Sequence, residues 1–239
     1  MERVALVTGA TRGIGFEVCR KLGLAGYRIL MTGIDASEGE AAVASLSGVV
    51  PEIRFFAMDV TEERQIDGVG AILQRDYGRL DVLVNNAAIS PYLGLERYDI
   101  ENSVLEGRME FLQSTFDTNT LGAIRVCRRF VPFMIDRGYG RVVNVTSGSG
   151  QLSGMESGWP GYRISKAGLN AFTRILAAEL KGLDILVNSV CPGQARTKLG
   201  GADAPLSPDE AADSIVWAAT LESGGPTGGF FRDGERIPW

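Results

Sequence analysis

Tyr162 and Lys166 are the two side chains in this sequence whose types and spacing point most directly to chemistry. They open and close the run Tyr162-Arg163-Ile164-Ser165-Lys166, and residues four apart share one face of a helix. A free phenol has a pKa of about 10, too high for easy proton exchange near neutrality. A neighbouring ammonium lowers that pKa, so the phenol can donate a proton to a developing alkoxide or take one from an alcohol. The same spacing also occurs where a buried ring and a solvated lysine open an amphipathic helix.

Ser147 and Asn119 are candidate partners of this pair. Ser147 closes a predicted strand, where its hydroxyl can hold a substrate oxygen against the tyrosine or only satisfy backbone groups. We favour Ser147 over Ser149 because it lies closer to the rigid strand. Asn119 falls inside a predicted long helix, where asparagine is a poor choice. It therefore indicates either a buried hydrogen-bond role, such as a kink that holds a water, or an exposed polar position.

The sequence contains no histidine. This excludes Ser-His-Asp and Cys-His nucleophilic sites, histidine-bound zinc and a histidine general base. The three cysteines, Cys19, Cys127 and Cys191, are scattered, which argues against a disulfide framework and fits a reducing compartment. We expect no metal site, and proton transfer has to come from Tyr, Lys, Asp, Glu, Cys or water.

A glycine-rich turn, Thr8-Gly9-Ala10-Thr11-Arg12-Gly13-Ile14-Gly15, lies between the first predicted strand and the first predicted helix. Glycines let a backbone approach a pyrophosphate closely, and a helix N-terminus offers free N–H groups and the positive end of its dipole. The spacing is Gly-x-x-x-Gly-x-Gly, which favours nucleotide binding but also suits a tight turn alone.

Polar residues follow two other predicted strands. Asp59, with Val60 after it, can accept a hydrogen bond from an adenine amino group or act as a turn or helix-cap residue before Thr61. Asn85 and Asn86 can hold a ribose or join neighbouring loops.

Strand-like and helix-like segments alternate along the whole chain. The expected strands cover 4–7, 28–32, 53–58, 82–84, 141–145, 185–190 and 228–231. The expected helices cover 14–24, 37–46, 63–77, 111–136, 161–181 and 208–221. Continuous apolar strands are typical of a parallel sheet covered on both faces, so we predict an α/β fold, a doubly wound parallel sheet of the Rossmann type with helices on both faces. The irregular segments 90–105, 148–160 and 193–207 should gather at the carboxyl edge, where ligands bind.

Length and composition narrow the function further. The chain has 239 residues, 45% hydrophobic and 22% charged, with a formal net charge of −5. This predicts a single domain over 1–239 without attraction to nucleic acid or anionic membranes. The chain enters an apolar strand at Val4 with no basic leader, so we expect a cytoplasmic protein.

Taken together, these residues resemble the short-chain dehydrogenase/reductase family over essentially the whole chain. The shared features are the glycine turn, Asp59, Asn85-Asn86-Ala87, Asn119, Ser147, Tyr162-x-x-x-Lys166, and Pro192-Gly193 with Thr197. The resemblance implies that Tyr162 is the catalytic acid or base, that Ser147 orients the carbonyl, that Lys166 tunes the tyrosine and binds ribose hydroxyls, and that Asn119 supports a water relay. It also implies a cofactor site made of Gly9, Thr11, Arg12, Gly13, Ile14, Asp59, Val60, Asn86, Ala87, Pro192, Gly193 and Thr197, together with Tyr162 and Lys166.

The tail resembles the carbonyl reductase branch of that family, in Cys191 to Thr197 and Pro226 to Gly234. Two features depart from that branch. The stretch from Ser147 to Tyr162 lacks the large insertion of animal monomeric carbonyl reductases, which leaves open a homodimer or homotetramer. The basic residue just past the second strand is also missing.

Cofactor preference is expected at the end of the second strand. A carboxylate there would accept the ribose 2′-OH of NAD and repel a 2′-phosphate, but Gly33 occupies the position. Arg12 can reach a 2′-phosphate, whereas Ile34 replaces a second cation and Asp35 lies close enough to repel. We therefore expect NADP(H) to be favoured, with NAD(H) as the alternative.

The predicted function is NADPH-dependent reduction of a ketone or aldehyde, with a small-molecule carbonyl or alcohol as substrate. The alternatives are an NAD-dependent alcohol or sugar dehydrogenase of the same family and a catalytically silent nucleotide-sensing Rossmann protein. The silent protein would be expected to lack the tyrosine or the lysine. An apolar, aromatic substrate pocket is suggested by Tyr92, Leu93, Leu152, Met155, Trp159 and Leu199, which can equally be loop-packing residues.

Overall fold

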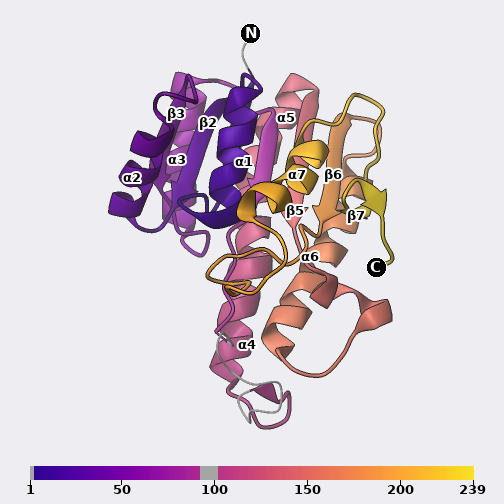
Figure 1. Cartoon of the computed structure of the whole chain (residues 1–239). Helices are drawn as coiled ribbons and strands as arrows, with labels where there is room; N and C mark the ends of the chain where they lie inside the picture. The colour runs from indigo at the N-terminus through magenta and orange to yellow at the C-terminus, as the bar shows by residue number, and fades with distance from the viewer. Residues whose placement is uncertain (1–2, 92–101) are drawn as a thin grey trace.

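A twisted sheet of eight strands forms the centre of the molecule (Figure 1). The computed structural model describes residues 3–91 and 102–239. The strand order is β3-β2-β1-β4-β5-β6-β7-β8, and every pairing except β7 with β8 is parallel. The strands are β1 (Val4–Val7), β2 (Arg28–Gly33), β3 (Ile53–Ala57), β4 (Val82–Asn85), β5 (Tyr139–Val145), β6 (Asp184–Val190), β7 (Phe230–Arg232) and β8 (Glu235–Arg236).

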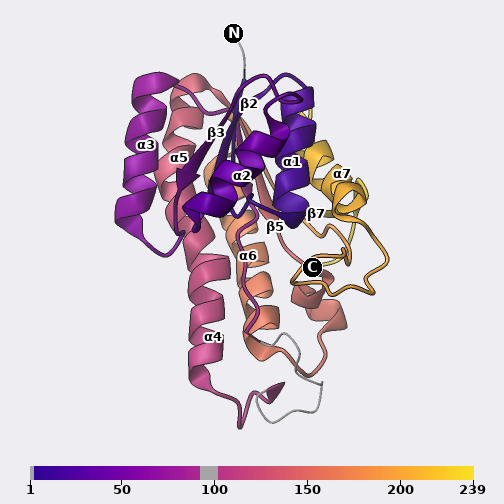
Figure 2. The same cartoon turned by 60° about the vertical axis from the view of Figure 1, so that its left-hand side comes forward.

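Helices cover both faces of the sheet (Figure 2). One face packs against α1 (Gly13–Leu24), α2 (Ala36–Leu46) and α7 (Pro208–Ala219), and the other against α3 (Glu63–Asp76), α5 (Ala123–Arg137) and α6 (Pro160–Glu179). Successive residues of β1 show why its whole run is apolar, since Val4 and Leu6 join one core cluster while Ala5 and Val7 join the other. The predicted doubly wound α/β fold is confirmed.

The chain reverses direction across the sheet between β1 and β4. It winds from β1 through β2 to β3, then returns to place β4 on the other side of β1. The turns after these two strands therefore meet at the carboxyl edge, the usual ligand site of such a sheet. Within the described residues, no helix is long and apolar enough to span a membrane.

The last strand differs from the sequence prediction, which ended the sheet at Phe231. After β7 the chain turns back through Asp233 and Gly234, whose φ values are +51° and +77°. Two positive φ angles are characteristic of a tight hairpin turn, so β8 pairs antiparallel with β7. The Asp-Gly pair was the available sequence signal.

The long helix expected over 111–136 is also interrupted. It begins as α4 (Met109–Phe116), widens into a π-helical turn (Asp117–Gly122) and continues as α5. Such single wide turns are common near functional sites. This one points the Thr120 hydroxyl at the Ser165 carbonyl of α6, at 2.8 Å, and buries Asn119.

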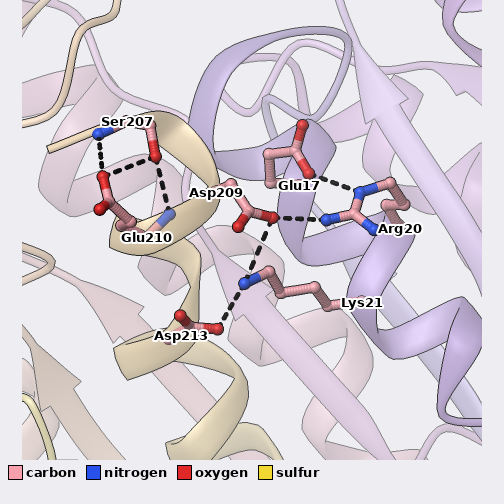
Figure 3. A network of polar contacts seen from close by, with 7 residues as sticks. All are labelled: Glu17, Arg20, Lys21, Ser207, Asp209, Glu210 and Asp213. Carbon is pink, nitrogen blue, oxygen red and sulfur yellow. Dashed lines mark hydrogen bonds and ion pairs between the residues drawn. The ribbon is translucent and has the colours of Figure 1, made fainter.

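Ionic contacts hold α7 against α1 (Figure 3). Asp209 accepts from Arg20 and lies 3.3 Å from the ammonium of Lys21, which also pairs with Asp213. Ser207 caps α7 in a reciprocal capping box with Glu210. Helix α7 follows the irregular segment 193–207 directly, so these contacts fix one end of that segment beside the helix that the glycine turn begins.

Candidate active site

Tyr162 lies in the first turn of α6, and its phenol is close enough to Ser147 for the serine hydroxyl to lower the pKa of the phenol. Ser147 follows β5 and begins a short 3-10 turn, where its hydroxyl oxygen accepts from the backbone N–H of Ser149 at 3.1 Å. The end of a central strand and the start of a long helix thus bring the two hydroxyls together. Ser149 has no comparable interaction with Tyr162, and its backbone N–H donates to the Ser147 hydroxyl oxygen.

Lys166 lies one turn further along α6 and is almost completely buried. Its ammonium donates to the Val145 carbonyl at 2.8 Å and lies 5.6 Å from the centroid of the Tyr162 ring. The i, i+4 spacing therefore gathers the phenol and the ammonium at the carboxyl end of β5.

Burial dominates the proton affinities of this pair. It raises the pKa of Tyr162 to about 12, and the hydrogen bond from Ser147 only partly opposes that rise. It lowers the pKa of Lys166 to about 8. The ammonium lies over the ring and donates to the Val145 carbonyl, while burial penalises both charged forms. The expected lowering of the tyrosine pKa by the lysine stays a prediction.

Asn119 is buried, with 1% of its surface exposed, which rules out the exposed reading. Its amide donates to the Ile89 carbonyl at 3.0 Å and to the Ser165 hydroxyl at 3.1 Å, and its oxygen accepts from the Ile89 N–H at 2.8 Å. The side chain therefore ties the segment after β4 to α6, beside Lys166. Because these side-chain atoms already form hydrogen bonds, the water relay expected at Asn119 would have to use other atoms of this residue.

The glycine turn offers an uncapped helix N-terminus. No side chain caps α1, and no acidic residue lies in its first turn. Gly9 has a φ of +60°, and a Cβ there would lie 2.7 Å from the Ala87 Cα atom. Free N–H groups, a positive dipole end and a backbone without side chains fit a pyrophosphate. Ile14, the second residue of α1, is partly buried.

Asn86 joins the two loops at the switch point. Its amide donates to the Thr8 and Gly9 carbonyls at 2.9 and 2.8 Å, while the Thr8 hydroxyl accepts from the N–H groups of Asn86 and Ala87. This is the second of its two predicted roles, and both amide hydrogens are occupied. Asn85 likewise donates to Asn144 of β5 at 2.8 Å.

Asp59 forms a turn with Thr61. One carboxylate oxygen accepts from the Thr61 N–H at 2.9 Å and hydroxyl at 2.8 Å. This supports the turn interpretation, and leaves the second oxygen for any contact with an adenine. Val60 is buried against Gly122 of the π-helical turn, where a Cβ would lie 2.6 Å from the valine methyl.

Glu38 is a residue that the sequence reading missed. Its carboxylate forms an ion pair with Arg12 and accepts from the Thr11 hydroxyl at 3.2 Å. Asp35 caps α2 by accepting from the Glu38 N–H, so it faces its own helix. Arg12 is thus already paired with a carboxylate, which a 2′-phosphate would have to displace. The available signal was the position of Glu38 in the first turn after the Asp35 cap.

The segment after β6 closes over the glycine turn. Pro192 is buried, Gly193 has a φ of +78°, and the methyl of Thr197 lies 3.2 Å from where a Cβ of Gly13 would be. The Thr197 hydroxyl accepts from the Gly200 N–H at 3.0 Å. The structure therefore places this predicted group opposite the start of α1.

The residues expected to cover the substrate are only partly described. Leu152 and Met155 are exposed at 72% and 39%, so neither is buried by loop packing. Trp159 and Leu199 are partly buried. Tyr92 and Leu93 lie outside the described residues. The sequence prediction also missed that Arg232 contacts Cys191. The Arg232 side chain lies against Gly148, the residue after Ser147.

Comparisons with known proteins agree with this geometry. A family model described as short chain dehydrogenase matches residues 3–205. Carbonyl reductase [NADPH] 1 of Sus scrofa is 33% identical, over 99% of this chain and 94% of that protein. (+)-Neomenthol dehydrogenase of Capsicum annuum is 30% identical, over 96% and 95%. Among solved structures, a metagenomic short-chain oxidoreductase in complex with NADP superposes with a TM-score of 0.80 at 28% identity, covering 96% of each chain.

Proposed function

Since this chain belongs to the short-chain dehydrogenase family, we propose that it reduces a ketone or aldehyde to an alcohol with NADPH. One observation carries the proposal. The Tyr162 phenol lies beside Ser147, whose hydroxyl favours the phenolate, and its ring lies over the ammonium of the buried Lys166, at the sheet edge where the glycine turn presents the free end of α1.

NADPH, when bound, supplies the hydride for the carbonyl carbon. The hydroxyls of Ser147 and Tyr162 both donate to the carbonyl oxygen in this proposal. In its support, the Ser149 N–H already occupies an acceptor position of the Ser147 oxygen, which leaves the Ser147 hydroxyl proton to donate. Tyr162 then transfers its proton to the developing alkoxide. A phenol whose pKa is raised to about 12 by burial stays protonated near neutrality, as a proton donor must.

Lys166 supports this transfer from below the ring. In its charged form the ammonium favours the phenolate that remains after the proton has left. We propose that a bound ribose draws this ammonium into a shared set of hydrogen bonds, in addition to the Val145 carbonyl. Asn119 keeps α6 and the segment after β4 in register beside it.

NADP(H) is the favoured cofactor. Gly33 ends β2 without a carboxylate, and Arg12 at the start of α1 can pair with a 2′-phosphate. The named relative carbonyl reductase [NADPH] 1 and the solved NADP complex support the same choice. The pyrophosphate is assigned to the N–H groups of α1, between Gly9 and Gly13, and Thr197 to the opposite wall.

We further propose that the chain works as one NAD(P)-binding domain in the cytoplasm, as a homodimer or homotetramer. Support for a reducing compartment comes from its three cysteines, all of them free and buried.

The proposal is tested by supplying NADPH or NADH with a panel of ketones and aldehydes and following cofactor absorbance. We expect consumption of NADPH that depends on the carbonyl compound, with a higher kcat/KM for NADPH than for NADH. Absence of turnover with every carbonyl compound, although NADPH binds, would contradict the assignment as a reductase.

A further inference from the structure

Arg232 is a charged side chain beside the site that the proposed reaction leaves unused. It ends β7, which runs parallel to β6. Its guanidinium donates to the sulfur of Cys191 at 3.3 Å, and the same sulfur accepts from the Gly148 N–H at 3.2 Å. A Cβ on Gly148 would lie only 2.8 Å from the guanidinium. Because Gly148 follows Ser147 directly, the cation lies against the turn that carries the substrate-orienting hydroxyl.

Arg232 differs from the other arginines that are similarly enclosed. In the described part of the chain, Arg79, Arg141 and Arg232 each have a buried side-chain nitrogen without a hydrogen-bond acceptor. Arg79 pairs with Asp81 at 2.6 Å, and Arg141 pairs with Asp184 at 3.1 Å. Arg232 forms no ion pair with any residue that the structure describes, and its one side-chain acceptor is a thiol.

The acidic residues next to Arg232 in sequence do not neutralise it. The Asp233 carboxylate is hydrogen-bonded with the Ser214 hydroxyl at 3.3 Å. Glu235 stands opposite Arg232 in the β7–β8 hairpin, and its side chain is exposed and outside ion-pair distance. A partly buried cation without a counter-ion among the described residues is costly, and an anion that binds from outside the protein would remove that cost.

A substrate can supply that anion. The guanidinium is a planar fork that matches a carboxylate with two parallel hydrogen bonds. Arg232 is only partly buried, so part of the side chain remains reachable. The short turn that starts at Gly148 touches Arg232 at one end, and at Gly150 a Cβ would lie 2.7 Å from the carbonyl carbon of Lys166. The cation and the residues of the proposed proton transfer therefore flank the same turn.

We propose that Arg232 binds a carboxylate of the substrate, and that the enzyme reduces oxo acids, in which a ketone or aldehyde and a carboxylate lie a few bonds apart. This inference rests on the proposed function, because Tyr162 and Ser147 take the carbonyl oxygen. The carbonyl carbon receives the hydride of NADPH, the carbonyl oxygen receives the Tyr162 proton, and the carboxylate is unchanged. The product is the corresponding hydroxy acid with NADP⁺.

The test compares oxo acids with their methyl esters, which keep the ketone and remove the charge. Rates with 2-oxopentanoate, 4-oxopentanoate and both esters are measured with NADPH for the wild type, Arg232→Gln, Arg232→Lys and the control Arg236→Gln. Arg236 is exposed and lies over the Phe231 ring, 5.5 Å from its centroid, so its loss removes the same charge elsewhere on the hairpin.

We expect the wild type to prefer at least one acid over its ester by about tenfold or more in kcat/KM, the ratio that a charge-assisted hydrogen bond supports. Arg232→Gln should abolish this preference while the ester rates stay within about threefold. Arg232→Lys should keep part of it, and Arg236→Gln all of it. The inference would be overturned if the wild type prefers both esters. It would also be overturned if Arg232→Gln slows the acid and the ester equally, which would leave Arg232 with a structural role.

A binding measurement separates this inference from the proposed function. Calorimetry with 2-hydroxypentanoate and 4-hydroxypentanoate should show binding to the NADP⁺-loaded and the cofactor-free wild type that is about tenfold weaker in Arg232→Gln. Such binding without any carbonyl reduction would count against the proposed function alone. Equal binding to wild type and variant would count against Arg232 alone.

Discussion

Lys166 sets the expected pH dependence of the reaction. Burial lowers its pKa to about 8 and raises that of Tyr162 to about 12. An ammonium keeps its charge below its pKa and loses it above, so the charge that supports the phenolate disappears as the pH rises through about 8. Tyr162 remains protonated throughout. We predict that kcat/KM for carbonyl reduction is level below about pH 8 and falls above it, up to about tenfold per pH unit.

The variant Lys166→Arg tests whether loss of the Lys166 charge causes the fall in kcat/KM above about pH 8. A guanidinium keeps its charge throughout this pH range, so the break near pH 8 should be missing from the variant, whatever activity it retains. A break at the same pH in both proteins would show that another group is responsible.

Ser147 and Ser149 form a matched pair for testing the substrate-orienting hydroxyl. Ser147 is the serine that acts on the pKa of Tyr162, while Ser149 offers its backbone N–H to Ser147. Ser147→Ala should lower kcat/KM by about tenfold or more, and Ser149→Ala, which keeps that N–H, by less than about threefold. If Ser149→Ala is the more damaging change, the roles of the two residues are reversed.

Glu38 should weaken the preference for NADPH. Its ion pair with Arg12 is exposed, with 60% and 48% of the two side chains accessible, and such pairs contribute about 0–1 kcal/mol. A 2′-phosphate can therefore displace it, but must do so beside a carboxylate. We predict that Glu38→Gln raises the ratio of kcat/KM for NADPH over NADH by about threefold to tenfold.

Two controls accompany this prediction. Glu40→Gln, in the exposed part of the same helix, should leave the NADPH:NADH ratio unchanged. Arg12→Ala should lower it. An equal response to Glu38→Gln and Glu40→Gln would assign the effect to overall charge and not to this ion pair.

At the residue scale, the polar side chains of the site could be predicted from the sequence, but their pKa values and interaction partners could not. The i, i+4 rule was sufficient to place Tyr162 and Lys166 on one helix face. The direction of the Tyr162 pKa depends on how deeply the finished fold buries it, which spacing does not encode. Glu38 reaches Arg12 only because α2 starts beside the glycine turn, a consequence of β1 and β2 being neighbours.

Among the elements, α7 has the clearest local stabilisation. The Ser207 hydroxyl accepts from the Glu210 N–H at 3.2 Å, and the Glu210 carboxylate accepts from the Ser207 N–H at 2.7 Å. Ser207→Ala should lower the free energy of unfolding by about 1 kcal/mol, a fall in Tm of about 2–4 °C for a chain of this size. Ser207→Asp should restore most of the loss.

Ser45→Ala is the control for Ser207→Ala, measured by the same thermal unfolding. Ser45 lies inside α2 and donates only to the Ala42 carbonyl, so its removal should cost no stability. Equal losses from Ser45→Ala and Ser207→Ala would contradict the capping role.

Element types were predictable because the periods of two and 3.6 residues are written in the apolar pattern. β1 was placed without error, and the other predicted elements differ from the structure by at most a few residues at each end. The π-helical turn was not predicted, because the contacts that hold it join segments distant in sequence. What holds it is the burial of Asn119 and Thr120 against α6 and Ile89, contacts distant in sequence.

In the whole molecule, the site is a product of strand order. Because these strands are parallel, the turn after β1, Asn86 after β4, Ser147 after β5, Cys191 after β6 and Arg232 at the end of β7 lie at one edge of the sheet. The alternation of strands and helices predicted this edge in general. It did not predict that Arg232 reaches back to Gly148, because the position of β7 beside β6 follows from tertiary packing.

The central claim is that Tyr162 donates the proton in an NADPH-dependent carbonyl reduction, and Tyr162→Phe tests it most directly. The change removes only the phenolic hydroxyl and keeps the ring over Lys166. With a ketone that the wild type reduces, kcat should fall by about 100-fold or more, while the Kd for NADPH stays within about threefold. Tyr139→Phe, at the opposite end of β5, should behave as the wild type. A Tyr162→Phe enzyme that retains activity within about tenfold of the wild type, about 1.4 kcal/mol of barrier, would contradict the claim.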